Sequence, residues 1–199
     1  MKLIDDTFSR LEDLQSRGYR VNIEQYIRKG VDIFRAAPEF FLLYSALYLV
    51  SMPVGGFILS GPLSAGFFIV SRKIDKNQQF QFEDFFDGFR MFVPLFLLTI
   101  VSGIAVFIGI LAFIIPGIYL SVGYTFAIFF VIFKNLDFWE AMEASRKLVG
   151  REWFSIFILV LVMGLLNFLG VLAFGIGILF TLPISFAALY AAFDDIFGS

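Results

Sequence analysis

Residues 91–133, MFVPLFLLTIVSGIAVFIGILAFIIPGIYLSVGYTFAIFFVIF, form an unbroken run of 43 residues without a charged side chain. A charge at the centre of a bilayer costs at least about 2.5 kcal/mol, so a run of this length indicates a segment that lies out of water. One membrane-spanning helix needs about 20 residues. The run is therefore long enough for two spans, and Pro116, Gly117 and Tyr119 near its middle form the motif at which we predict the turn between them.

Two further uncharged blocks lie on either side of this run, at residues 40–71 and 153–193. The later block has 41 residues, with Gly170, Gly175 and Gly177 near its middle, and predicts a second helical hairpin. The earlier block has only 32 residues, so we expect its first helix to begin near Val31 or Phe34 and to turn at residues 51–56. A single pass or a re-entrant segment is the alternative for this block.

The composition agrees with a membrane protein, because 59% of the 199 residues are hydrophobic, 19% are aromatic and only 16% are charged. Soluble domains are typically about 45–50% apolar and about 25% charged. The predicted fold is an all-α polytopic membrane protein with about six transmembrane helices arranged as three hairpins. Residues 1–30 are predicted to be a cytoplasmic amphipathic segment and residues 31–197 the six-helix transmembrane domain. The first apolar run starts past residue 35, so the N-terminus does not have the pattern of a signal peptide.

All 15 Lys and Arg residues lie outside the three blocks. With six spans they all fall on one side of the membrane, which the positive-inside rule makes the cytoplasmic side, together with both termini. With five spans they would divide seven against eight, and no bias would remain. The charge distribution therefore favours six spans.

The polar segment before each block has the character of an interfacial amphipathic helix. In the last of these, Phe138 and Trp139 would lie on an apolar face with Met142, Leu148 and Val149, while Glu143 and Lys147 form an i,i+4 pair on the polar face. We interpret Phe138, Trp139, Glu143 and Lys147 as a candidate partner or interface helix, although a solvated helix with a packing face fits the pattern equally well. The order of polar segment, apolar helix, turn and apolar helix recurs three times. It indicates either a threefold internal repeat or the ordinary alternation of a six-span protein.

Reactive groups are absent from the predicted membrane interior. The chain has no Cys and no His, which excludes thiolate and imidazole chemistry and the usual ligands of zinc, copper and iron–sulfur clusters. No catalytic residue, metal site or cofactor is predicted, and a net charge of −2 argues against nucleic acid as a partner. Asn167 is the one amide inside a block and is expected to hydrogen-bond a neighbouring helix or, as the alternative, a ligand.

The stretch Ile115-Pro-Gly-Ile-Tyr-Leu-Ser-Val-Gly-Tyr124, followed by Phe138-Trp-Glu-Ala-Met-Glu-Ala-Ser-Arg-Lys-Leu-Val-Gly150 and Trp153, resembles a bacterial family. This family comprises the membrane domain attached to some glycerophosphodiester phosphodiesterases and related stand-alone integral membrane proteins. The resemblance covers residues 20–197 and implies a six-span fold in a bacterial inner membrane, without an established activity. No stretch of the chain is long or polar enough to form the phosphodiesterase barrel.

Two functional hypotheses follow from these patterns. The first is a non-enzymatic membrane subunit, anchor or scaffold that presents its charged cytoplasmic face to a protein partner or to a second copy of the chain. The second is a conduit for lipids or apolar solutes, in which hairpins interrupted by glycine form a groove that needs no charged side chains along its path. Membrane lipids are expected partners in both cases.

Overall fold

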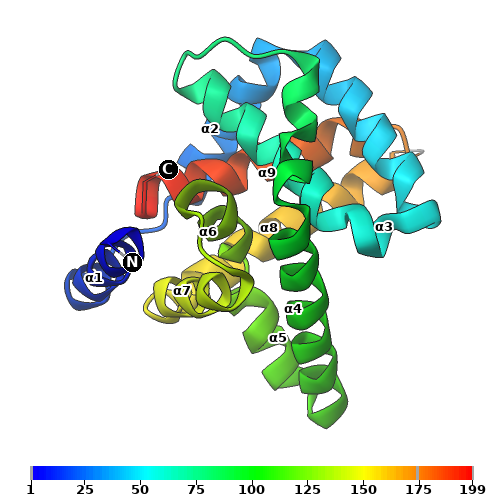
Figure 1. Ribbon diagram of the computed structural model, residues 1–199. Helices are drawn as coiled ribbons and strands as arrows, with labels where there is room; N and C mark the ends of the chain where they lie inside the picture. Colours follow the sequence, from blue (N-terminus) through cyan, green and yellow to red (C-terminus); the bar gives the residue numbers. More distant parts are fainter. Residues whose placement is uncertain (1, 174, 199) are drawn as a thin grey trace.

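The computed structural model describes residues 2–173 and 175–198, and all secondary structure in this part of the chain is helical (Figure 1). The elements in chain order are α1 (Lys2–Arg17), α2 (Ile23–Ala36), α3 (Pro38–Asp75), the 3₁₀ helix η1 (Phe82–Met91), α4 (Phe92–Ala112), α5 (Ile114–Gly123), α6 (Ala127–Lys134), α7 (Phe138–Gly150), α8 (Trp153–Leu172) and α9 (Ile178–Ile196).

Four stretches of the described chain are long and apolar enough to cross a membrane: Phe82–Ala112, Ile114–Lys134, Trp153–Leu172 and Ile178–Ile196. A fifth is obtained if α2 and the first part of α3, Ile23–Ala36 and Pro38–Pro53, are taken as one span bent by 100°. The protein is therefore an all-α polytopic membrane protein. The number of crossings that the helices support by length and composition is four or five, against the predicted six.

The first uncharged block folds as a helical hairpin within α3. The chain kinks at Gly55, which has non-helical backbone angles and lies inside the turn predicted at residues 51–56. The two arms then pack together, since the Tyr44 hydroxyl shares its proton between the carbonyl oxygens of Leu63 (2.8 Å) and Phe85 (3.0 Å), and the rings of Tyr44 and Phe67 lie 4.8 Å apart.

The first arm of this hairpin begins at Pro38 and not near Val31 or Phe34, because α2 is a separate helix that ends at Ala36. Pro38 occupies the first helical turn, where its missing N–H is not needed. The boundary predicted at residue 30 consequently lies inside α2, and the change of direction comes after this helix.

The second hairpin corrects the predicted position of a turn. Pro116, Gly117 and Tyr119 all lie inside α5, and the turn is made by Phe113, whose backbone is extended. Pro116 is tolerated there because it falls in the first turn of the helix. Gly117 serves close packing, since a Cβ atom built on Gly109 of α4 would lie 2.9 Å from the Gly117 Cα atom. The α4–α5 hairpin projects from the rest of the molecule (Figure 1), and its tip is apolar and highly exposed, with Phe113 at 77%.

The centre of the fold is formed by the second arm of α3 with α6 and α9. Phe129 of α6 contacts one phenylalanine from each of the other two helices, with its ring centroid 4.2 Å from that of Phe68 and 4.8 Å from that of Phe193. All three rings are buried, whereas α4 and α8 bury few of their large apolar side chains. The outer helices are thus suited to face lipid and the inner ones to hold the fold together.

Three short polar helices lie against this centre in a regular order. Helix α2 packs on α9, η1 packs on α3, and α7 packs on α6. The first two contacts depend on glycines, because a Cβ atom on Gly30 would lie 2.8 Å from the Ile184 carbonyl oxygen and one on Gly88 would overlap the Pro62 carbonyl oxygen. Each short helix precedes one hairpin in the chain and packs more extensively on a different one.

Candidate functional site

The helix that the sequence singled out, α7, begins with the predicted capping box. The Glu140 backbone N–H donates to the Asp137 carboxylate at 2.8 Å, and the Asp137 N–H donates to the Glu140 carboxylate at 3.4 Å. These bonds satisfy N–H groups that have no partner inside the helix. The cap fixes where α7 starts and so places Phe138 and Trp139 in its first turn.

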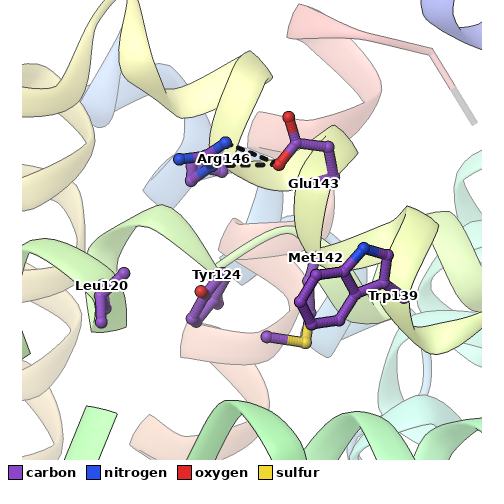
Figure 2. A pocket seen from close by; sticks show the side chains of 6 residues that line it. All are labelled: Leu120, Tyr124, Trp139, Met142, Glu143 and Arg146. Carbon is purple, nitrogen blue, oxygen red and sulfur yellow. Dashed lines mark hydrogen bonds and ion pairs between the residues drawn. The ribbon is translucent and has the colours of Figure 1, made fainter. Parts of the chain in front are cut away.

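A pocket of about 240 Å³ lies between α7 and the end of α5, and Trp139 and Glu143 are among its walls (Figure 2). Figure 2 shows the lining side chains, which are Leu120, Tyr124, Trp139, Met142, Glu143 and Arg146. Glu143 pairs with Lys147 at 4.0 Å, which confirms the predicted i,i+4 pair, and it makes a shorter i,i+3 pair with Arg146 at 2.8 Å. We call this cavity the interfacial pocket.

The interfacial pocket combines an aromatic wall with an ion pair. Trp139 is 65% exposed, and Tyr119 lies outside the pocket, where its ring stacks on Trp153 at 5.6 Å and its carbonyl accepts the Trp153 indole N–H. Within the described residues no group of three or more carboxylates could hold a metal ion. The geometry fits the binding of an amphipathic group or partner side chain.

The rest of the predicted apolar face of α7 packs on protein and not on lipid. Met142, Leu148 and Val149 are buried, because α6 covers one side of the helix and α1 another. Helix α1 is held by the Gln15 side chain and the Tyr19 hydroxyl, which donate to the carbonyl oxygens of Lys147 (3.0 Å) and Leu148 (2.7 Å). Burial raises the pKa of Tyr19, with Glu152 adding to the effect, so this phenol remains a proton donor.

Ser145 connects α7 to the break between α5 and α6. Its hydroxyl, fully buried, donates to the Gly123 carbonyl oxygen at 2.7 Å and accepts the Phe126 backbone N–H at 3.1 Å. Both backbone groups lie at the interruption of the helix, where α-helical partners are lacking.

Ser145→Ala is therefore expected to lower the free energy of unfolding by about 1–3 kcal/mol, because it leaves two buried backbone groups without a partner. Thermal unfolding of the purified protein in detergent, followed by circular dichroism, measures the effect. Ser121→Ala is the matched control, since the Ser121 hydroxyl bonds within its own helix at an exposed position, and it should unfold like the wild type. Equal unfolding temperatures for both variants would contradict the structural role of Ser145.

Asn167 lies on α8, and its side-chain oxygen is buried without a hydrogen-bond partner among the described residues. The Thr181 hydroxyl of the neighbouring α9 is likewise buried and unpartnered. The Asn167 oxygen therefore does not form the expected bond to another helix within the described residues.

A charged cluster that sequence reasoning missed lies where the inner helices end. Lys29 of α2 is 2.9 Å from Asp75 of α3 and 3.5 Å from Asp194 of α9, while Lys76 lies 3.1 Å from Asp194. Both carboxylates are more than four-fifths buried, and Asp75 also accepts the Tyr190 hydroxyl at 3.0 Å. We call Lys29, Asp75, Lys76 and Asp194 the ion-pair network. The signal in the sequence was that Asp75, Lys76 and Asp194 come soon after an apolar arm ends.

No protein-family model, curated protein or solved structure matches this chain.

Proposed function

We propose that the protein is a non-enzymatic integral membrane protein that acts as a subunit, anchor or scaffold and presents its charged face to a partner. The observation that carries this proposal is the ion-pair network, which joins α2, α3 and α9 through two largely buried carboxylates. Helix α7 and the segment of α1 are bound to each other by the side-chain hydrogen bonds of Gln15 and Tyr19. A layer of short helices held in this way is suited to present exposed groups such as Trp139 in a defined arrangement.

The proposal includes the topology. We infer six crossings arranged as three hairpins in a bacterial inner membrane, with the charged face and both termini in the cytoplasm. The cyclic order in which α2, η1 and α7 pack on α9, α3 and α6 supports a threefold internal repeat. Membership of the family that includes the membrane domain of glycerophosphodiester phosphodiesterases is part of the same proposal and rests on the motif at residues 115–124.

The proposed topology predicts how single cysteines react, and the chain has no native Cys. Phe113→Cys at the exposed tip of the α4–α5 hairpin should be labelled in intact cells by a membrane-impermeant maleimide. Gln79→Cys, in the loop between α3 and η1, should be labelled only after the cells are made permeable. Labelling of Gln79→Cys from outside would overturn the orientation.

The scaffold proposal is tested by mild extraction of the tagged protein and mass spectrometry of the proteins and lipids that co-purify. We expect a stoichiometric protein partner, and we expect Trp139→Ala to reduce its recovery. Phe168→Ala is the matched control, because it removes a similarly exposed aromatic ring from α8, which is suited to face lipid. Recovery of the protein alone under conditions that preserve membrane complexes would contradict the proposal.

One observation favours a conduit as the second candidate function. A cavity of about 200 Å³ lies between α3, α4 and the α5–α6 break, and its lining includes five residues that carry a hydroxyl group, Ser60, Ser64, Thr99, Ser102 and Tyr124. Such a cavity can receive an uncharged polar group inside the apolar layer. Protein-dependent movement of fluorescent lipid across liposome membranes is the expected result, and its absence at every protein density would exclude this function.

A further inference from the structure

A third cavity, of about 380 Å³, lies between the end of α3, the end of η1 and the end of α6. Its charged lining consists of Arg72 and Lys73 from α3 with Asp87 and Arg90 from η1. Its apolar lining includes Ile69, Met91, Ile132 and Phe133. No contact of the proposed partner helix α7 is involved, so this cavity is independent of the scaffold proposal.

The cavity lies at the level where the apolar part of each element gives way to charge. Helix α3 passes from Ile69 to Arg72 within one turn, and α6 ends with Phe133 and Lys134. The third wall of the cavity comes from η1, in which Arg90 is the last charged residue before the apolar helix α4 begins at Phe92. Since α4 and α6 belong to stretches apolar enough to span a membrane, this boundary corresponds to the lipid headgroup region.

The charges around the cavity leave an excess of positive charge. Lys73 lies 2.8 Å from Asp84 and Arg90 lies 2.9 Å from Asp87, but Arg72 has no carboxylate within ion-pair distance among the described residues. The Arg72 guanidinium lies 4.6 Å from the centre of the Phe133 ring. A cation over a ring keeps N–H donors for a planar or tetrahedral anion, and Arg is the side chain that binds phosphate oxygens in pairs.

Arg90 can join Arg72, because its side chain is 82% exposed and its pair with Asp87 is a surface pair of little energetic weight. Lys134 follows the cavity-lining Phe133 at the end of α6, so the surroundings add a further cation. Asp194 attracts Lys134, but this carboxylate already serves Lys29 and Lys76.

We propose that this cavity binds the phosphate of an anionic phospholipid headgroup, with Arg72 as the principal ligand, Arg90 as a second one and the apolar walls of Ile69 and Ile132 against the start of the acyl chains. The negative charge of the lipid complements the excess of cations. The apolar walls distinguish a lipid phosphate from a free phosphate, which has no apolar part to bury.

Native mass spectrometry of the full-length protein in detergent tests the proposal, with dioleoylphosphatidylglycerol and dioleoylphosphatidylcholine added in equal amounts. The wild type should retain phosphatidylglycerol in preference to phosphatidylcholine, and Arg72→Gln should weaken that retention about fivefold. Arg28→Gln is the matched control, since it removes the same charge from an exposed pair on α2 and should leave the preference unchanged. Arg72→Lys, which keeps the charge but not the planar fork, should lie between Arg72→Gln and the wild type.

Three results would overturn the proposal. They are equal retention of both lipids by the wild type, the same loss of preference in Arg28→Gln as in Arg72→Gln, and displacement of the lipid by inorganic phosphate at millimolar concentration. The last result would assign the site to a free anion. If Arg72→Gln does not fold, as judged by gel filtration, Arg90→Gln replaces it, because that exposed side chain makes no buried contact and its removal should still weaken retention.

Discussion

Gly66→Ala is expected to unfold at a markedly lower temperature than the wild type. A Cβ atom at Gly66 would overlap the carbonyl oxygen of Phe85 and lie 2.6 Å from the Tyr44 hydroxyl, so η1 would have to move away from α3. Overpacking of this kind typically costs about 1–3 kcal/mol. For a chain of this size each kcal/mol corresponds to about 2–4 °C in the unfolding temperature. Thermal unfolding in detergent, monitored by circular dichroism, gives the comparison.

Gly164→Ala provides the matched control for this variant. Gly164 also lies inside a long apolar helix, α8, but a Cβ atom there would meet nothing within 4 Å. Because alanine has the higher helix propensity, this change should leave stability unchanged or raise it by up to about 1 kcal/mol. Similar behaviour of the two variants would show that η1 does not pack on α3 as described.

Asp75→Ala is expected to destabilise the protein to a similar degree. The change removes the nearest carboxylate of Lys29, at 2.9 Å, and the acceptor of the Tyr190 hydroxyl, at 3.0 Å. Hydrogen bonds to charged groups contribute about 1.5–3 kcal/mol, and Lys29 is left partly buried with Asp194 at 3.5 Å. Urea or thermal unfolding in detergent should show the loss, and proteolysis should become faster at the link between α2 and α3.

The control for this variant is Glu24→Gln, which breaks the Arg28–Glu24 pair on the exposed side of α2. That ion pair is as short, at 2.7 Å, but both side chains are about three-quarters exposed, so little change in stability is expected. If the two variants lose stability equally, the ion-pair network has no special part in joining α2 to the inner helices.

Much of the helical layout follows from the distribution of charge along the chain. The turns near Gly55 and after Gly170 and the start of α7 at Asp137 fall where breakers and caps predict them, because these signals act within a few residues. The lengths of the second and third uncharged blocks, 43 and 41 residues, likewise predict two helices in each. The number of membrane crossings was harder to predict from the sequence, because the first uncharged block is short and α2 meets α3 at an angle of 100°.

The sequence was less informative where tertiary contacts decide the position of a turn or the surroundings of a helix face. Pro116 and Gly117 have the composition of a turn but form a contact between α4 and α5, which only the partner Gly109 explains. The apolar face of α7 has the pattern of a lipid-facing surface, yet α1 and α6 cover it. Trp139 and Glu143 do line one pocket. Asp75 and Asp194 each follow an apolar stretch, but they lie far apart in sequence, and only the tertiary fold brings both of them to Lys29.

The packing of α2 on α9 has a consequence for biogenesis. These helices lie at opposite ends of the described chain, so the ribosome must deliver every intervening segment before the contact at Gly30 can form. Contacts of such long sequence separation form late and slowly. During translation the Gly30 face of α2 is therefore uncovered and Lys29 can pair with Asp75 of α3 but not with Asp194. A nascent chain stalled before α9 thus presents a surface that membrane chaperones or proteases can recognise.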